Sequence, residues 1–182
     1  MMGLVGISTE KYVFTLSRAL TVSDLHSAYK PLIVEAIDLE LCGTNDYAEY
    51  FCVSVANPSE IQLVVIQCFG SHGNIFNPAI LYVPETDLLF IGAGKRISSF
   101  HLNPYTKLWL DTADMGFLSW ARYGEFVVMS AELELVAWRI NGEKLWTTFV
   151  EPPWDYTVLD RQINLDVMGN KTTFSLEEGP TV

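Results

Sequence analysis

The sequence predicts an all-β fold, mainly antiparallel, in which a unit of four short strands is repeated. The 182-residue chain is apolar, with 49 % hydrophobic and 18 % charged residues, so it can bury a core. Its apolar runs, such as residues 61–69, have the length of strands and are too short to cross a bilayer, which takes about 20 residues. The third observation is an internal repeat in the second half of the chain.

The repeat is visible when residues 89–103 are aligned with residues 127–141. Phe100-His101-Leu102 then returns as Trp138-Arg139-Ile140, a step of 138 − 100 = 38 residues. Self-similarity at this period is typical of proteins built from stacked structural units.

The repeat continues downstream of these segments. Lys107-Leu108-Trp109 returns as Lys144-Leu145-Trp146, at a step of 146 − 109 = 37, so one residue has been lost between the copies. A third, partial copy follows at residues 163–176, in which Phe174-Ser175-Leu176 corresponds to Phe100-His101-Leu102. The second half of the chain therefore contains three related units.

Each copy divides into short β elements. Residues 126–130 form an apolar run of strand length, and residues 135–140 are rich in β-branched and aromatic side chains. Asn141-Gly142 predicts a two-residue type I′ hairpin turn, in which both central residues have positive φ. Asn103-Pro104 predicts a turn at the same place in the preceding copy. The next strand begins at residues 144–149, and about 40 residues with four strands correspond to one β-propeller blade.

The order of a strand, a tight turn, an aromatic-x-aliphatic strand and Asn-x-x-Lys-Leu-Trp resembles the repeats of pyrroloquinoline-quinone-type β-propellers. The resemblance covers residues 76–176 and implies that Trp109 and Trp146 pack between neighbouring blades. Thr106 and Glu143 replace the glycine that typically precedes Lys-Leu-Trp in that family. The quinone and metal ligands of the catalytic propellers have no counterpart in this sequence, so the resemblance implies architecture and no cofactor.

Residues 1–75 fit the repeat poorly and are expected to form a degenerate blade or a cap. We expect one domain over residues 1–182, with about four blade-sized units; a β-sandwich is the alternative. The repeat units are predicted at residues 76–116, 117–155 and 156–180. Within the first third, strands are expected at residues 12–16, 32–41, 51–55 and 61–69, and a short helix at Ser23–Tyr29 with Ser23 as its N-cap.

Small twisted sheets must close or cap their edges, because open edges pair with other chains. Three assemblies satisfy this condition: a closed small propeller, a stacked open array with capping ends, or two chains that form one larger ring. The sequence leaves all three open, the homodimer included.

The formal net charge of −11 argues against nucleic acid as a partner, since phosphate binding needs clustered Lys and Arg. The acids are scattered along the sequence, which is typical of a solvated surface; a surface that meets a basic partner is the alternative. Cys42, Cys52 and Cys68 show no C-x-x-C spacing and are expected to be small buried hydrophobes. The N-terminus lacks a signal-peptide pattern, so we expect a cytoplasmic protein without membrane contact.

No motif predicts a catalytic, metal or cofactor residue. Gly92-x-Gly94-Lys95 lacks the spacing of a phosphate loop, because position 89 is Leu and position 96 is Arg; it predicts a turn in which glycine supplies positive φ. The remaining candidates are histidines outside any ligand spacing and close carboxylate pairs, which a glycosidase, a Ca²⁺ site or a solvated strand could each contain. They are His26, His72 and His101, and the pairs Asp38 with Glu40 and Glu132 with Glu134.

The aromatic cluster around Pro152-Pro153 is the candidate partner-binding site. The cluster contains Trp146, Phe149, Trp154 and Tyr156, with Trp154 expected in a loop. The residues expected to bind a partner are Phe149, Trp154 and Tyr156. Aromatic side chains beside prolines form rigid apolar platforms, although they could equally cap the end of a blade. The function predicted is a non-enzymatic protein-interaction or scaffold module. The alternatives are an acidic neutraliser of a basic partner, as in bacterial immunity proteins, and a carbohydrate-active or carbohydrate-binding protein.

Overall fold

The computed structural model describes residues 2–19, 21, 23, 35–37, 48–58, 60–70 and 77–181. The chain divides into two compact units, Met1–Asn74 (unit 1) and Ile75–Val182 (unit 2). All sixteen elements with described bounds are β-strands, and every pairing except one is antiparallel. The predicted all-β, mainly antiparallel fold class is therefore confirmed. The helix expected at Ser23–Tyr29 lies outside the described residues, Ser23 excepted.

Unit 1 contains a five-stranded sheet in the order β1-β2-β4-β5-β3. Its strands are β1 (Met2–Ser8), β2 (Val13–Ala19), β3 (Glu35–Ile37), β4 (Ala48–Asn57) and β5 (Glu60–Gly70). The strands expected around residues 51–55 and 61–69 are present as β4 and β5, whereas β1 was not predicted. Strand β3 runs parallel to β5, so this sheet differs from a meander of four antiparallel strands.

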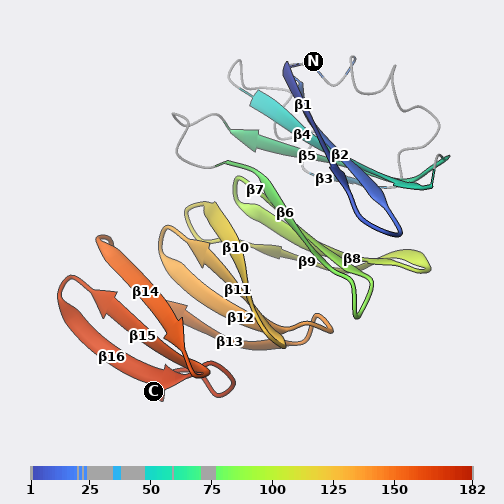
Figure 1. Cartoon of the computed structure of the whole chain (residues 1–182). Coiled ribbons are helices and arrows are strands. Elements are labelled where there is room, and N and C mark those ends of the chain that lie inside the picture. Colours follow the sequence, from blue (N-terminus) through green and yellow to red (C-terminus); the bar gives the residue numbers. More distant parts are fainter. Residues whose placement is uncertain are drawn as a thin grey trace. The chain divides into compact units, whose positions relative to one another are not determined.

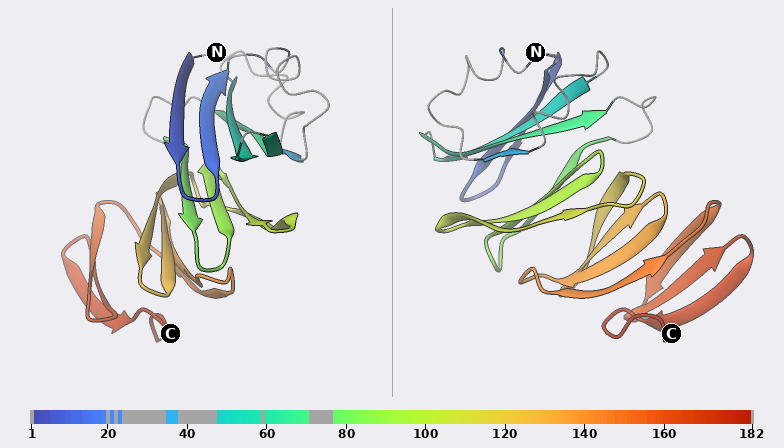
Figure 2. Two further views of the ribbon diagram at one scale, coloured as in Figure 1. Left: turned by 45° about the vertical axis from the view of Figure 1, so that its right-hand side comes forward. Right: turned by 180° about the vertical axis from the view of Figure 1, so that it is seen from behind.

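Unit 2 contains three antiparallel meanders, in which each strand pairs with its neighbours along the chain. Sheet B is β6 (Ala79–Val83), β7 (Leu88–Ala93), β8 (Arg96–Leu102) and β9 (Tyr105–Thr112). Sheet C is β10 (Phe117–Tyr123), β11 (Phe126–Ala131), β12 (Glu134–Arg139) and β13 (Lys144–Phe149). Sheet D is β14 (Trp154–Leu159), β15 (Gln162–Val167) and β16 (Asn170–Ser175). These are blade-like units, which stand in succession in Figures 1 and 2.

One backbone hydrogen bond occurs in all three meanders and shows that the copies share a register. In each, the amide that follows or ends the third strand donates to a carbonyl in the turn between the first two strands. The three bonds are Leu102 N to Asp87 O (2.9 Å), Ile140 N to Glu125 O (3.0 Å) and Leu176 N to Arg161 O (2.9 Å). The third copy, although it has only three strands, therefore follows the same backbone plan.

An aromatic cluster forms the core between sheets B and C. Trp138 of β12 is 1 % exposed and stacks on Trp109 of β9, with ring centroids 5.4 Å apart and planes 13° apart. Trp120 packs edge-on against Trp138 at 5.6 Å, and Phe90 lies 5.4 Å from Trp120. Such pairs contribute about 0.5–1.5 kcal/mol each beyond the burial of their surface, so sheets B and C are firmly joined.

Trp109 and Trp146 each join one sheet to the next. The indole Nε1 of Trp109 donates to the carbonyl of Gly142 at 3.0 Å, and that of Trp146 donates to the carbonyl of Leu176 at 2.9 Å. A Cβ on Gly179 would lie 2.5 Å from Trp146 Cγ, so the indole packs directly on glycine backbone. The structure thus confirms the role that the propeller resemblance implies for both tryptophans.

The turn after β12 differs from the predicted type I′ hairpin. Only Gly142 has positive φ (87°), and the loop extends from Arg139 to Lys144 with a bulge opposite Trp138. The side chain of Asn141 accepts a hydrogen bond from the amide of Glu143 at 3.0 Å, which favours a longer turn with a normal φ at Asn141. The predicted turn at Gly94 is confirmed, since Gly94 has φ 57°.

Sheet D has one apolar and one polar face. Its apolar face, with Ile163, Leu165 and Phe174, packs against sheet C. The strand pairing places nine residues on the other face: Asp155, Thr157, Leu159, Gln162, Asn164, Asp166, Lys171, Thr173 and Ser175. Leu159 is the single apolar member of this set, and a polar outer face of this kind is typical of the capping unit of a repeat array.

Gly92 should tolerate no side chain, because a Cβ there would lie 2.5 Å from the ring of Phe117. We expect Gly92→Ala to lower the free energy of unfolding by about 1–3 kcal/mol through overpacking. Chemical denaturation followed by tryptophan fluorescence measures this, since all five tryptophans lie in unit 2. In the double variant with Phe117→Leu the two effects should couple by at least about 0.5 kcal/mol; strict additivity would contradict the contact.

Trp146→Phe should lower the free energy of unfolding of unit 2 by about 1–3 kcal/mol, because it removes the bond to Leu176 and part of the packing on Gly179. Trp109→Phe should have an effect of similar size, since its indole also donates to a backbone carbonyl of the next sheet and stacks on Trp138. The same fluorescence denaturation measures both variants, and a negligible loss for either would show that the inter-sheet contact contributes little.

Candidate functional site

The three predicted aromatic residues lie on two strands of unit 2. Trp154 and Tyr156 face the core from β14, where both are half-buried, and their rings stack at 6.2 Å and 25°. Phe149 is the last residue of β13 and is 65 % exposed. Trp154 is thus in a strand and not in the expected loop, because its backbone pairs with Val167 of β15.

Trp154 and Tyr156 tie sheet D to sheet C. The indole of Trp154 donates to the carbonyl of Glu132 at 3.0 Å. The hydroxyl of Tyr123 donates to that of Tyr156 over 3.5 Å, and burial, with a smaller contribution from Tyr123, raises the pKa of Tyr156. The phenol therefore stays neutral. Direct use of these two rings by a partner remains a prediction, whereas Phe149 projects into solvent.

The connections that follow β7, β9, β11, β13 and β15 meet at one edge of unit 2, which we call the loop edge. It comprises residues 94–95, 113–116, 131–134, 149–155 and 168–169. Hydrogen bonds join these connections across the three sheets: Glu132 N to Gly116 O at 3.1 Å, Val150 N to Leu133 O at 3.0 Å and Met168 N to Pro153 O at 2.9 Å. With the indole of Trp154 bonded to Glu132, the loop edge is a hydrogen-bonded surface with little freedom to rearrange.

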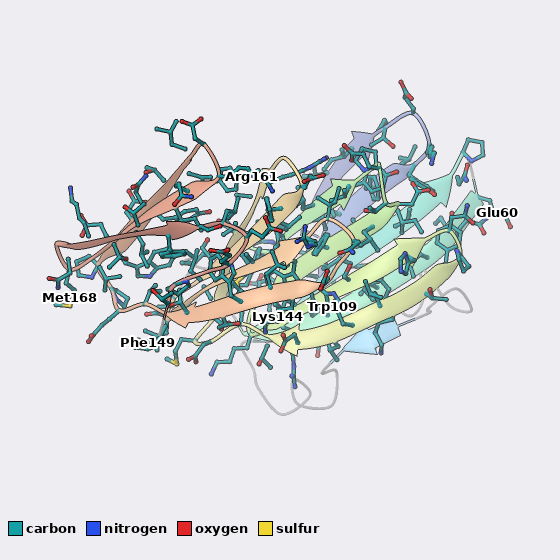
Figure 3. The ribbon with its side chains drawn as sticks, turned by 90° about the horizontal axis from the view of Figure 1, so that it is seen from below. Glu60, Trp109, Lys144, Phe149, Arg161 and Met168 are labelled. Atoms are coloured by element: carbon teal, nitrogen blue, oxygen red, sulfur yellow. The ribbon has the colours of Figure 1, made fainter. Side chains whose placement is uncertain are left out.

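Three large apolar side chains project from the loop edge. Met115 is 49 % exposed, Phe149 65 % and Met168 59 %. Figure 3 shows Phe149 and Met168 toward the same end of unit 2, away from Arg161 and Lys144. Met115 belongs to the same edge because Gly116, the next residue, accepts the amide of Glu132. Single exposed apolar residues are ordinary, so it is their occurrence together at one edge that makes this edge a candidate site.

The loop edge is also acidic. Its segments between residues 113 and 155 contain five acids and no Lys or Arg, whereas the turn at residues 94–95 adds one exposed cation, Lys95. The five acids are Asp114, Glu132, Glu134, Glu151 and Asp155. The carboxylate of Glu134 accepts the amide of Asp114 at 2.8 Å. Burial raises the pKa of Glu134, and the negative charges of Asp114 and Asp111 add to the increase. The hydrogen bond from Asp114 and the ammonium of Lys144, which pairs with Asp111 at 2.8 Å, act in the opposite direction and lower the pKa of Glu134 in part.

The opposite edge of unit 2 has paired charges. Arg122 forms a two-fold hydrogen bond with Glu85, at 3.0 and 2.7 Å, between sheets C and B. Arg139 pairs with Glu177, and Arg161 lies 3.5 Å from the same carboxylate. Cations therefore balance acids between the turns of neighbouring sheets at this edge, in contrast to the loop edge.

Most of the histidines and carboxylates considered for chemistry lie outside the described residues. His101 is half-buried on β8, while His26, His72, Asp38 and Glu40 lie outside the described residues. Within the described ranges no three His, Cys, Asp or Glu side chains are grouped as a metal site would require. No helix among those residues combines the length and the hydropathy of a membrane span.

The cysteines have structural environments. Cys52 is buried and free, and burial raises the pKa of its thiol to about 11, so it is not a ready nucleophile. Cys68 is disulfide-bonded. Disulfides persist mainly in oxidising compartments, so this bond is unusual for a cytoplasmic protein. The cytoplasmic location remains a prediction.

Met115, Met168 and the clustering of the acids were not recognised from the sequence. The repeat contained a usable signal, since Glu132 and Met168 are 168 − 132 = 36 residues apart and occupy the same turn of successive copies. Placing every such turn on one edge would have brought these residues together.

No family model matches the sequence, and no curated protein matches it. Solved structures resemble it weakly, and two of them are given as examples. One is Hsv2 from Kluyveromyces marxianus, with 8 % identity and a TM-score of 0.37 over 75 % of this chain and 50 % of that one. The other is BamB from Moraxella catarrhalis, with 11 % identity and a TM-score of 0.39 over 70 % and 41 %. The chain spans half or less of each, and the fold assignment rests on the sheets themselves.

Glu134→Gln should raise the midpoint of thermal unfolding at pH 7. The raised pKa means that the folded state binds the proton of Glu134 more tightly than the unfolded state, so this residue destabilises the fold as pH rises through its pKa. Glutamine keeps an acceptor for the amide of Asp114 but has no charge.

The gain should vanish below about pH 4, where the carboxyl of Glu134 is protonated in both states. Thermal unfolding of both proteins across this pH range measures the effect. Glu151→Gln, at an exposed position of the same edge, is the control and should change little. A gain that is independent of pH would point to a cause other than the charge of Glu134.

Proposed function

We propose that the chain is a non-enzymatic protein-interaction module that binds its partner through the loop edge. The observation that supports this most directly is the grouping of Met115, Phe149 and Met168, each 49–65 % exposed, on connections hydrogen-bonded across three sheets. Loops held by a rigid β scaffold are a common place for binding residues.

The predicted aromatic residues take different parts in this proposal. Phe149 contacts the partner directly, since its ring is exposed at the end of β13. Trp154 is a positioning residue that holds the connection after β11 through the carbonyl of Glu132. Tyr156 supports Trp154 from the same strand by stacking on it. A partner would therefore meet a surface that needs little ordering on binding, which reduces the entropic cost of association.

The double variant Met115→Ser, Phe149→Ser should lose the partner while remaining folded, because it removes two exposed apolar contacts and no buried ones. Affinity capture from an extract of the source cells, quantified protein by protein, measures this. Leu159→Ser is the matched control, since Leu159 is 67 % exposed but lies next to the turn at the opposite edge.

Proteins captured by the native chain and by Leu159→Ser, but lost with the double variant, are the expected result. Fluorescence denaturation of all three proteins verifies that they are equally folded. Equal capture by the double variant and the control would contradict the assignment of binding to the loop edge.

A further inference from the structure

We infer that the loop edge binds a polypeptide segment that combines lysine or arginine with an apolar anchor residue. This rests on the proposed function and specifies the chemistry of the partner. The inference starts from the three exposed apolar side chains, and the charge around them decides which occupant fits.

The apolar residues supply the anchor site. Phe149 is the most exposed of the three, and its backbone pairs with Glu134, whose carboxylate accepts the amide of Asp114. Met115 is the next residue after Asp114 in the chain, so an exposed thioether belongs to the same connection as the amide that Glu134 accepts. Methionine side chains adapt to the shape of an apolar group, and buried anchors contribute most of the affinity at protein interfaces.

The acids determine the charge of the partner. None of the five acids on the segments between residues 113 and 155 forms an ion pair with a residue in the described part of the chain. The raised pKa of Glu134 has part of its cause in repulsion by Asp114 and Asp111. Lys144 already attracts these carboxylates, and a cation of the partner would add to that attraction. Complementary charge also speeds encounter.

Other occupants fit less well. A second copy of the chain carries a net charge of −11, and its Arg122, Arg139 and Arg161 already pair with carboxylates. A nucleic acid would add like charge to an acidic surface. A segment with basic and apolar side chains can pair with the acids and also contact the exposed apolar residues.

The test uses the full chain and three labelled synthetic peptides of equal length, composed of lysine with leucine, lysine with serine, and glutamate with leucine. Fluorescence anisotropy measures the dissociation constant of each at low and at physiological ionic strength. We expect the lysine–leucine peptide to bind at least about tenfold more tightly than the other two, with affinity that falls as salt rises.

Two variants separate the contributions of charge and apolar contact. Glu132→Gln with Glu151→Gln should weaken the binding of the lysine–leucine peptide and flatten its salt dependence. Met115→Ser with Phe149→Ser should weaken binding and leave the salt dependence in place. Glu178→Gln, exposed beyond β16 at the opposite edge, is the control and should change neither.

Equal binding of the glutamate–leucine peptide, or equal binding of the lysine–serine peptide, would overturn the inference, as would variants without effect. The proposed function can be judged separately. Proteins could be captured through Met115 and Phe149 in a way that is insensitive to salt and to Glu132→Gln with Glu151→Gln. That result would support the proposed interaction module and contradict a basic partner. If neither peptides nor proteins bind at the loop edge, both fail.

Discussion

The contact of a tryptophan with the glycine turn of the next sheet is the constraint on which unit 2 depends. A buried indole N–H needs an acceptor, and the carbonyl of Gly142 supplies it for Trp109. Gly142 has φ 87°, and a Cβ there would lie 2.3 Å from the side chain of Leu108, beside Trp109. Gly179 has φ 76°, and a Cβ there would lie 2.5 Å from the indole of Trp146. Each contact fixes the stagger of one sheet against the next, and the stagger decides which loops meet.

The loop edge follows from that stagger. In the antiparallel sheets, the connections after odd-numbered strands lie at one edge and those after even-numbered strands lie at the other. The two edges differ in the bonds that join their loops. At one edge, arginines such as Arg122 join the acids of neighbouring turns. At the other, Trp154 and backbone amides join the loops, which leaves Phe149 and the carboxylates available to solvent. The exposed ring of Phe149 makes no bond between sheets, so under the proposed function it can change without loss of the fold.

The sequence predicted the repeat and its strands because the residues that create them recur at fixed steps. Trp109 and Trp146 are 37 apart, as are Gly142 and Gly179, and this spacing reflects a contact made twice. The predicted type I′ turn failed because the side chain of Asn141 bonds the backbone of Glu143, a competition that the dipeptide alone does not reveal. The acids looked scattered because they are distant in sequence, and only the topology brings their loops together.

The polar face of sheet D explains why binding should concentrate at the loop edge. Another four-strand unit stacked on this face would bury Asp155, Asp166 and Lys171, together with the pair in which Thr173 donates to Asn164 at 2.8 Å. Burying such groups without new partners is costly, so a ring that two chains close through this face is disfavoured. An association surface must instead be one where apolar groups are already exposed and charges lack partners, and in unit 2 the loop edge meets both conditions.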